Sequence, residues 1–156
     1  MKESVPIHVS QAGVASMDDI DWNSVISTFI LSSDAGDHVF VIKQTDKSIV
    51  FQNSAFELDE TTIDTCCRIF LDNGAVVFKE GFELFRSQHF DPIRVDDEGI
   101  YARKSNSPNE GIVLIRTFHF VIGATYASTM YPAATVECSE AVGDYVRALE
   151  EDFVRI

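Results

Sequence analysis

The spacing of apolar residues along the chain changes from a helical period to a strand period and back again. Residues 18–31 and 59–71 carry apolar side chains at intervals of three and four, so each segment is predicted to form an amphipathic helix. Asp59 is expected to cap the start of the second helix. Asn73-Gly74 is expected to end it, because both residues tolerate the left-handed backbone of a helix C-terminus.

Strand patterns occupy the rest of the chain up to the last helix. Residues 38–53 predict a β-hairpin, and six further runs are rich in β-branched and aromatic residues: 75–78, 82–87, 89–95, 99–104, 111–117 and 118–126. Strands joined by such short breaks, for example 105–109, pair antiparallel, because a parallel crossover needs about a dozen residues. The run 111–117 is predicted to be buried on both faces. A last helix is predicted to begin at Pro132, with an apolar stripe of Val142, Tyr145, Val146 and Leu149.

This order of elements predicts an α+β domain, since strands outnumber helices and the helices lie mostly near the chain ends. We expect one antiparallel sheet with helices packed on its faces, formed by a single domain over residues 17–156. Residues 1–16 are polar and are interpreted as an N-terminal extension. The protein is expected to be a monomer.

Composition narrows the functional classes. Apolar residues make up 46% of the chain, enough for a buried core, whereas the net charge of −13 disfavours nucleic-acid binding, which needs basic residues to replace phosphate counterions. No apolar run approaches the roughly 18 residues of a membrane-spanning helix. The three cysteines are an odd number, so Cys66, Cys67 and Cys138 are interpreted as reduced thiols of a cytoplasmic protein.

The sequence contains no residue arrangement typical of catalysis or metal binding. The four histidines lack metal-ligand spacing, and no nucleophile lies beside an evident base. His119 is interpreted as a packed or surface residue, and Asp96-Asp97-Glu98-Gly99 as a solvated turn rather than a cation site. The sequence therefore predicts a binding protein and not an enzyme, with no catalytic residue, no cofactor and no metal. A hydrolase or other catalyst is the less favoured class.

Several short segments carry a resemblance to a known family. They are Asp21-Trp22-Asn23, SIVF at 48–51, GIYARKSN at 99–106, Arg116-Thr117 and the ending MYPAATVECSEAVGDYV at 130–146. In this order they resemble the profilins, small actin-monomer-binding proteins, over residues 18–152. The resemblance implies a profilin-like central antiparallel sheet of about six or seven strands. The N- and C-terminal helices would lie on one face and a smaller helix on the other. The segment IRVDDEGIYARKSN and the ending are most similar to the fourth, testis-type branch of the family.

The resemblance implies a surface for proline-rich ligands, such as formin-type segments, between the terminal helices. Profilins bind a polyproline II helix, which is ordered before binding, on a platform of aromatic rings. The implied polyproline-binding residues are Trp22, Phe51, Tyr145 and Phe153. Phe51 replaces a family tryptophan and Val25 a family tyrosine. The C-terminal family tyrosine falls on or near Glu151, and Phe153 takes its place if the end aligns two residues differently, so we expect weaker binding than in ordinary profilins.

The resemblance also implies a surface for monomeric actin on the late strands and the start of the last helix. Its candidate residues are Arg94, Arg103, Lys104, Met130, Pro132 and Glu137. Met130-x-Pro132 resembles the plant and lower-eukaryote form of this turn, whereas Val136 and Glu137 replace polar or basic residues. Because a like charge opposite an acidic partner weakens association, we expect weak actin binding. The protein is thus expected to regulate actin assembly in the cytoplasm, at the cytoskeleton.

An alternative follows from the testis-type branch, which is associated with acidic phospholipids instead of actin or polyproline. The implied lipid-binding residues are Arg86, Arg94, Arg103, Lys104 and Arg116. They form one basic patch only if strand alternation brings them to one face of the sheet. The net charge of −13 limits such binding to a focused, salt-sensitive patch.

Overall fold

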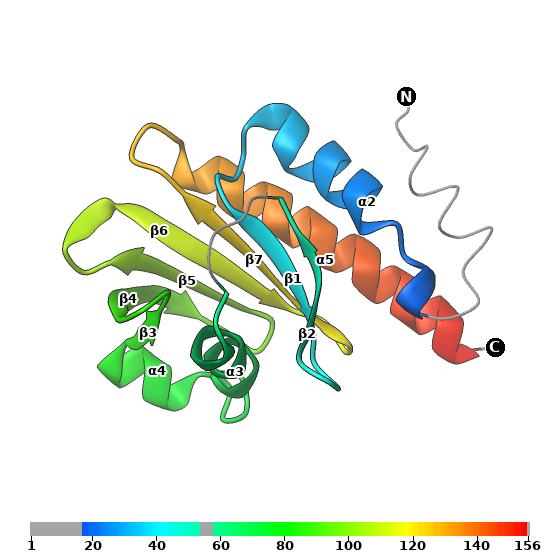
Figure 1. Ribbon diagram of the computed structural model, residues 1–156, viewed down its shortest axis with the longest axis horizontal. Helices are drawn as coiled ribbons and strands as arrows, with labels where there is room; N and C mark the ends of the chain where they lie inside the picture. The colour runs from blue at the N-terminus through cyan, green and yellow to red at the C-terminus, as the bar shows by residue number, and fades with distance from the viewer. Residues whose placement is uncertain (1–16, 54–57, 156) are drawn as a thin grey trace.

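Seven strands form one antiparallel sheet in the order β2-β1-β7-β6-β5-β4-β3 (Figure 1). The computed structural model describes residues 17–53 and 58–155, so the expected extension at 1–16 lies outside the described residues. The sheet confirms the α+β class and the expected number of strands. The strands are β1 Val39–Lys43, β2 Ser48–Gln52, β3 Phe82–Leu84, β4 Gln88–Val95, β5 Gly99–Lys104, β6 Ser107–Arg116 and β7 Phe120–Tyr126.

The sheet separates two apolar cores. On one face α2 (Trp22–Phe29) and α5 (Pro132–Arg155) lie side by side, and α5 packs on β6 and β7 (Figure 1). On the other face α3 (Glu60–Arg68) and α4 (Ala75–Glu80) cover a second cluster that includes the fully buried Phe40 and Phe90. The terminal helices therefore share one face, as expected, and two small helices instead of one cover the other.

The first expected helix is divided into three pieces. Two 3-10 turns, η1 (Met17–Asp19) and η2 (Leu31–Ser33), flank α2. The α-helix begins at Trp22 because the Asp21 carboxylate accepts a hydrogen bond from the Ser24 backbone N–H, at 3.2 Å. The capping interaction fixes Trp22 in the first turn.

The prediction of a strand over residues 75–78 is wrong, because these residues belong to α4. Asp72 accepts hydrogen bonds from the backbone N–H groups of Gly74 (3.0 Å) and Val76 (3.2 Å), and Gly74 has a φ of 77°. Asn73-Gly74 thus precedes a new helix instead of ending the previous one, which already stops at Arg68. These local hydrogen bonds outweigh the strand preference of the two valines, which is a weak and context-dependent preference.

Other predictions for the fold are confirmed. Asp59 caps α3 by accepting a hydrogen bond from the Thr62 backbone N–H, at 2.8 Å. Residues 111–115 of β6 are all buried, although the strand already begins at Ser107, inside the break expected at 105–109. The α5 helix begins at Pro132, and its predicted apolar stripe is buried. In the described part of the chain, no helix has the length and apolar character needed to cross a membrane.

Candidate functional site

The terminal helices bring Trp22 and Tyr145 into one apolar cluster. The Trp22 ring stands edge-on to Phe120, with 4.8 Å between ring centroids and 73° between planes. Tyr145 of α5 packs against Phe29 of α2, with ring centroids 5.7 Å apart. Trp22 is only 7% exposed and Tyr145 9%, so most of each ring lies inside the protein.

Two further predicted platform residues lie at the margin of the same cluster. Phe51 of β2 and Phe153 of α5 are half-buried and pack against it. Val25, one turn after Trp22, is completely buried. All four predicted platform residues therefore belong to one cluster, in which the outer surface is supplied by Phe51 and Phe153 more than by Trp22 and Tyr145.

The other candidate surface lies on β4 and β5, on the side of the sheet that carries α5. Arg94 pairs with Tyr101 across β4 and β5, and Tyr101 contacts α5. Arg103 lies two residues further along β5, so it points to the same side, and it pairs with Gly111, which in turn pairs with Tyr126 at the end of β7. Both arginines are exposed. The paired residues Arg103, Gly111 and Tyr126 therefore form a row across the sheet, which ends next to the turn that precedes α5.

That turn holds the first residues of α5 in place. The Met130 backbone N–H donates to the Ala127 carbonyl at 2.9 Å, and the Met130 sulfur accepts from the Ala127 N–H at 3.5 Å. Pro132 is the first helical residue, and Glu137, one turn later, is exposed. Five of the six predicted actin-binding residues thus lie on one side of the sheet or in the turn and helix that cover it.

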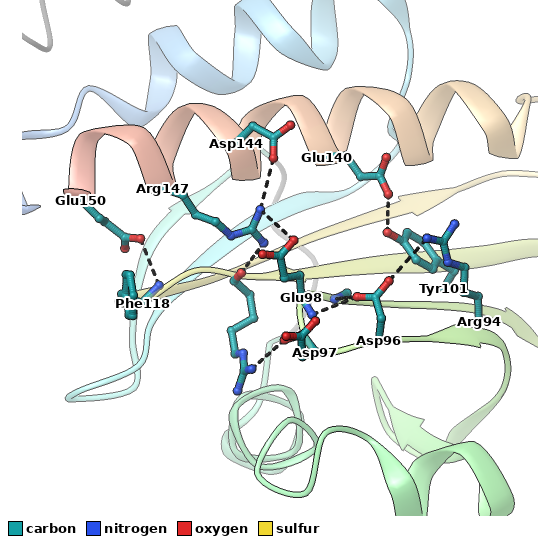
Figure 2. Close-up of polar contacts among 12 residues, drawn as sticks. Arg94, Asp96, Asp97, Glu98, Tyr101, Phe118, Glu140, Asp144, Arg147 and Glu150 are labelled. Atoms are coloured by element: carbon teal, nitrogen blue, oxygen red, sulfur yellow. Dashed lines mark hydrogen bonds and ion pairs between the residues drawn. The ribbon is translucent and has the colours of Figure 1, made fainter. Parts of the chain in front are cut away.

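Charged side chains connect this strand surface to α5 (Figure 2). The Arg94 guanidinium lies over the Tyr101 ring, 5.3 Å from its centroid, and 3.5 Å from the Asp96 carboxylate. The Tyr101 hydroxyl donates to Glu140 at 2.5 Å, and both residues line a cleft of about 250 Å³. Burial, followed by the hydrogen bond to Glu140, raises the pKa of Tyr101. Its hydroxyl is therefore a donor throughout the neutral range.

The comparison with protein families decides the identity of this fold. The profilin family model matches residues 20–150. The chain belongs to the profilin family. Membership of this family of non-enzymatic proteins confirms the expectation that the chain is not an enzyme. Among curated relatives, Profilin-4 of Rattus norvegicus is 31% identical over 111 residues, which cover 71% of this chain and 83% of the relative.

Solved profilins share the architecture at low sequence identity. Profilin of Schizosaccharomyces pombe has a TM-score of 0.72 at 22% identity, covering 83% of this chain and 98% of that one. Mouse profilin IIa, in complex with a double repeat from the FH1 domain of mDia1, has a TM-score of 0.66 at 12% identity, and the match covers 83% of this chain and 99% of that one. LokiProfilin2, in complex with rabbit actin, has a TM-score of 0.61 at 12% identity, and the match covers 82% of this chain and 94% of that one. At these identities the likeness establishes the fold.

The predicted basic residues of this profilin do not form one patch. Lys104 follows Arg103 directly and points to the opposite side of β5, where it donates a 2.9 Å hydrogen bond to Glu110 that lowers the pKa of Glu110. Arg116 also lies on that side, over the ring of Phe70 at 5.3 Å. The condition for a single lipid-binding face is therefore not met, because the sheet separates Arg94 and Arg103 from Lys104 and Arg116.

The fifth member of the lipid set, Arg86, lies in the turn between β3 and β4. It lines a cavity of about 410 Å³ together with Lys104 and Glu110. Arg86 and its two neighbours in this turn have left-handed backbone angles, with φ of 52°, 63° and 72° for Phe85, Arg86 and Ser87. The structure therefore brings Arg86 together with Lys104 and not with Arg94 or Arg103.

The sequence interpretation missed three polar residues of α5 that organise this side of the molecule. Glu140 accepts from Tyr101, Arg147 reaches the Arg116 carbonyl at 2.5 Å, and Glu150 is a completely buried carboxylate. Figure 2 shows all three on the side of α5 that faces the strands. The spacing of four residues from the buried Val146 to Glu150 was the available signal, because such positions share a helix face.

Among residues 17–53 and 58–155, no group of three histidine, cysteine or acidic side chains is arranged to hold a metal ion. The three cysteines are free thiols, and burial raises the pKa of Cys66 and Cys67, which favours their protonated form.

Proposed function

We propose that this profilin binds monomeric actin and regulates actin assembly in the cytoplasm, at the cytoskeleton. The observation that carries the proposal is the position of Arg94 and Arg103. Both are exposed on β4 and β5, on the side of the sheet that leads to the turn at Met130 and Pro132. The actin complex of the structural neighbour LokiProfilin2 supports the choice of partner.

The charges of this surface favour a weak complex. Arg94 and Arg103 supply positive charge for an acidic partner, but Asp96, Glu137 and Glu140 lie on the same side. Acidic groups opposite an acidic partner are repelled, and this repulsion lowers affinity and slows association. We therefore expect sequestration of actin only at high concentrations of this protein.

Actin polymerisation tests the proposal directly. Pyrene-labelled actin is polymerised with increasing amounts of the protein, and the filament fraction is measured in parallel by sedimentation. A dose-dependent decrease in both signals is expected. Unchanged polymerisation at a large excess of the folded protein contradicts actin-monomer binding.

A second candidate function is the binding of proline-rich ligands, including formin-type segments, between α2 and α5. The half-buried rings of Phe51 and Phe153, at the margin of the cluster that contains Trp22, favour it, because a preformed polyproline II helix packs its proline rings on such aromatic edges. The FH1 complex of the neighbour mouse profilin IIa supports the ligand class. Titration with poly-L-proline is expected to shift the emission of Trp22, the only tryptophan. A flat titration counts against this function.

Acidic phospholipid is the alternative ligand, for a diverged profilin that has lost actin and polyproline binding. The separation of the basic residues between two sides of the sheet disfavours it, because a flat lipid surface contacts one side at a time. This alternative would be favoured if the protein does not bind actin but co-sediments with anionic vesicles at low salt and no longer does so at high salt.

A further inference from the structure

Glu150, near the end of α5, places its carboxylate completely inside the protein, with a side-chain exposed fraction of 0%. The turn between β6 and β7 surrounds it. The carboxylate accepts hydrogen bonds from the Thr117 hydroxyl at 2.8 Å and from the backbone N–H groups of Phe118 (3.0 Å) and His119 (2.9 Å). The His119 ring nitrogen Nδ1 lies 3.0 Å away. Figure 2 shows Glu150 extending from α5 towards Phe118.

The same turn fixes the start of β7. The Phe120 backbone N–H donates to the Thr117 hydroxyl at 3.1 Å. From the other side, the Gln44 amide donates to the carbonyls of Thr117 (2.9 Å) and Phe120 (3.3 Å). Phe120 is 1% exposed, and its ring is the one on which Trp22 stands at 4.8 Å. An unbroken series of contacts therefore runs from Glu150 through the turn to Phe120 and Trp22.

We infer that Glu150 is a positioning residue for the proline-ligand surface: by holding the β6–β7 turn, it sets the orientation of Phe120 and thereby of the Trp22 indole. The inference rests on the proline-ligand function proposed above. A carboxylate suits this turn, because it has two acceptor oxygens for the donors of Thr117, Phe118 and His119. A carboxamide has one acceptor oxygen, and its NH₂ group would face other donors in a space closed to water.

The test compares Glu150→Gln with Glu80→Gln, the same change at an exposed residue of α4 on the other face of the sheet. Circular dichroism establishes that each variant is folded. Trp22 emission and its quenching by acrylamide report the indole position, and titration with poly-L-proline reports affinity. Glu150→Gln is expected to shift the emission, to increase quenching and to weaken poly-L-proline binding about fivefold, whereas Glu80→Gln matches the wild-type protein.

A folded Glu150→Gln variant with wild-type emission and quenching overturns the inference, because a purely structural role lowers stability without moving the indole. If this variant does not fold, the inference is tested with His119→Ala and His119→Asn instead. Asparagine restores a donor near the position of Nδ1, so it is expected to recover the Trp22 signal that alanine changes, and equal signals in both variants overturn the inference. Emission and quenching need no ligand. If the wild-type protein does not bind poly-L-proline, the proline-ligand function is refuted, whereas the emission and quenching results still test the positioning role of Glu150.

Discussion

The Tyr101 hydroxyl donates a 2.5 Å hydrogen bond to the Glu140 carboxylate and joins the middle of the sheet to α5. Tyr101→Phe keeps the ring under Arg94 but leaves Glu140 without this donor. We expect a loss of about 1 kcal/mol in the free energy of unfolding, a typical net value for such a bond. Urea denaturation measures it. Tyr131→Phe, at a residue that is 81% exposed, is the matched control and is expected to be neutral.

The same hydrogen bond predicts the alkaline behaviour of the protein. Burial and Glu140 raise the pKa of Tyr101 above its value in the unfolded chain, near 10. Its stabilising contribution is therefore complete below about pH 10 and is lost as the pH rises towards the folded-state pKa, because the unfolded chain then releases the proton first. Unfolding free energies measured between pH 8 and 11 should decline more steeply in the wild-type protein than in Tyr101→Phe. Equal slopes would contradict the shift.

Gly143 permits the close approach of α5 to β6. A Cβ atom at this position would lie 2.6 Å from the Ile115 Cγ2 atom. Alanine improves helix propensity by about 1 kcal/mol, but overpacking costs about 1–3 kcal/mol. We expect Gly143→Ala to lower the free energy of unfolding, measured by urea denaturation. Ala148→Gly, at an exposed position of the same helix, calibrates the propensity effect alone. A stabilised Gly143→Ala would show that α5 can move away from the sheet without cost.

The sequence was sufficient for two helix starts whose causes are local. The capping of α3 by Asp59 and the start of α5 at Pro132 depend on neighbouring residues, and both predictions are confirmed. Residues 75–78 were predicted wrongly although their cause is also local. The hydrogen bonds of Asp72 and the backbone of Gly74 compete with a β-branched pattern, and the pattern alone does not indicate which prevails.

The candidate sites depended on distant contacts. Adjacent positions in a strand face opposite sides, so Arg103 and Lys104 were separable from sequence. The side of the sheet that Arg94 occupies could not be predicted from the sequence, because the strand register shifts between Pro92 and Arg94. Glu150 gives the clearest case: its donors lie more than thirty residues earlier, and only the folded chain brings them to it.

Charge reversal tests the arrangement of the actin surface. Arg94→Glu and Arg103→Glu are each expected to weaken actin binding about tenfold, because each replaces attraction to an acidic partner by repulsion. Lys104→Glu is expected to have a much smaller effect, since Lys104 faces the opposite side of the sheet. Arg68→Glu on α3 is the control for net charge. Actin binding is measured by sedimentation. An equal loss of actin affinity in all four variants would indicate a general charge effect and contradict a localised surface.

The outer aromatic rings test whether the cluster between the terminal helices is a ligand surface or only a core. Phe51→Ala and Phe153→Ala each remove a half-buried ring at its margin and are expected to weaken poly-L-proline binding about tenfold, as for other aromatic anchors. Trp22 emission follows the titration, because Trp22 is retained in both variants. Phe78→Ala, on α4 at the other side of the sheet, removes a ring that is 59% exposed and should leave affinity unchanged. If the two rings serve only to pack the helices, urea denaturation will show lower stability while the affinity of the folded variants stays that of the wild-type protein.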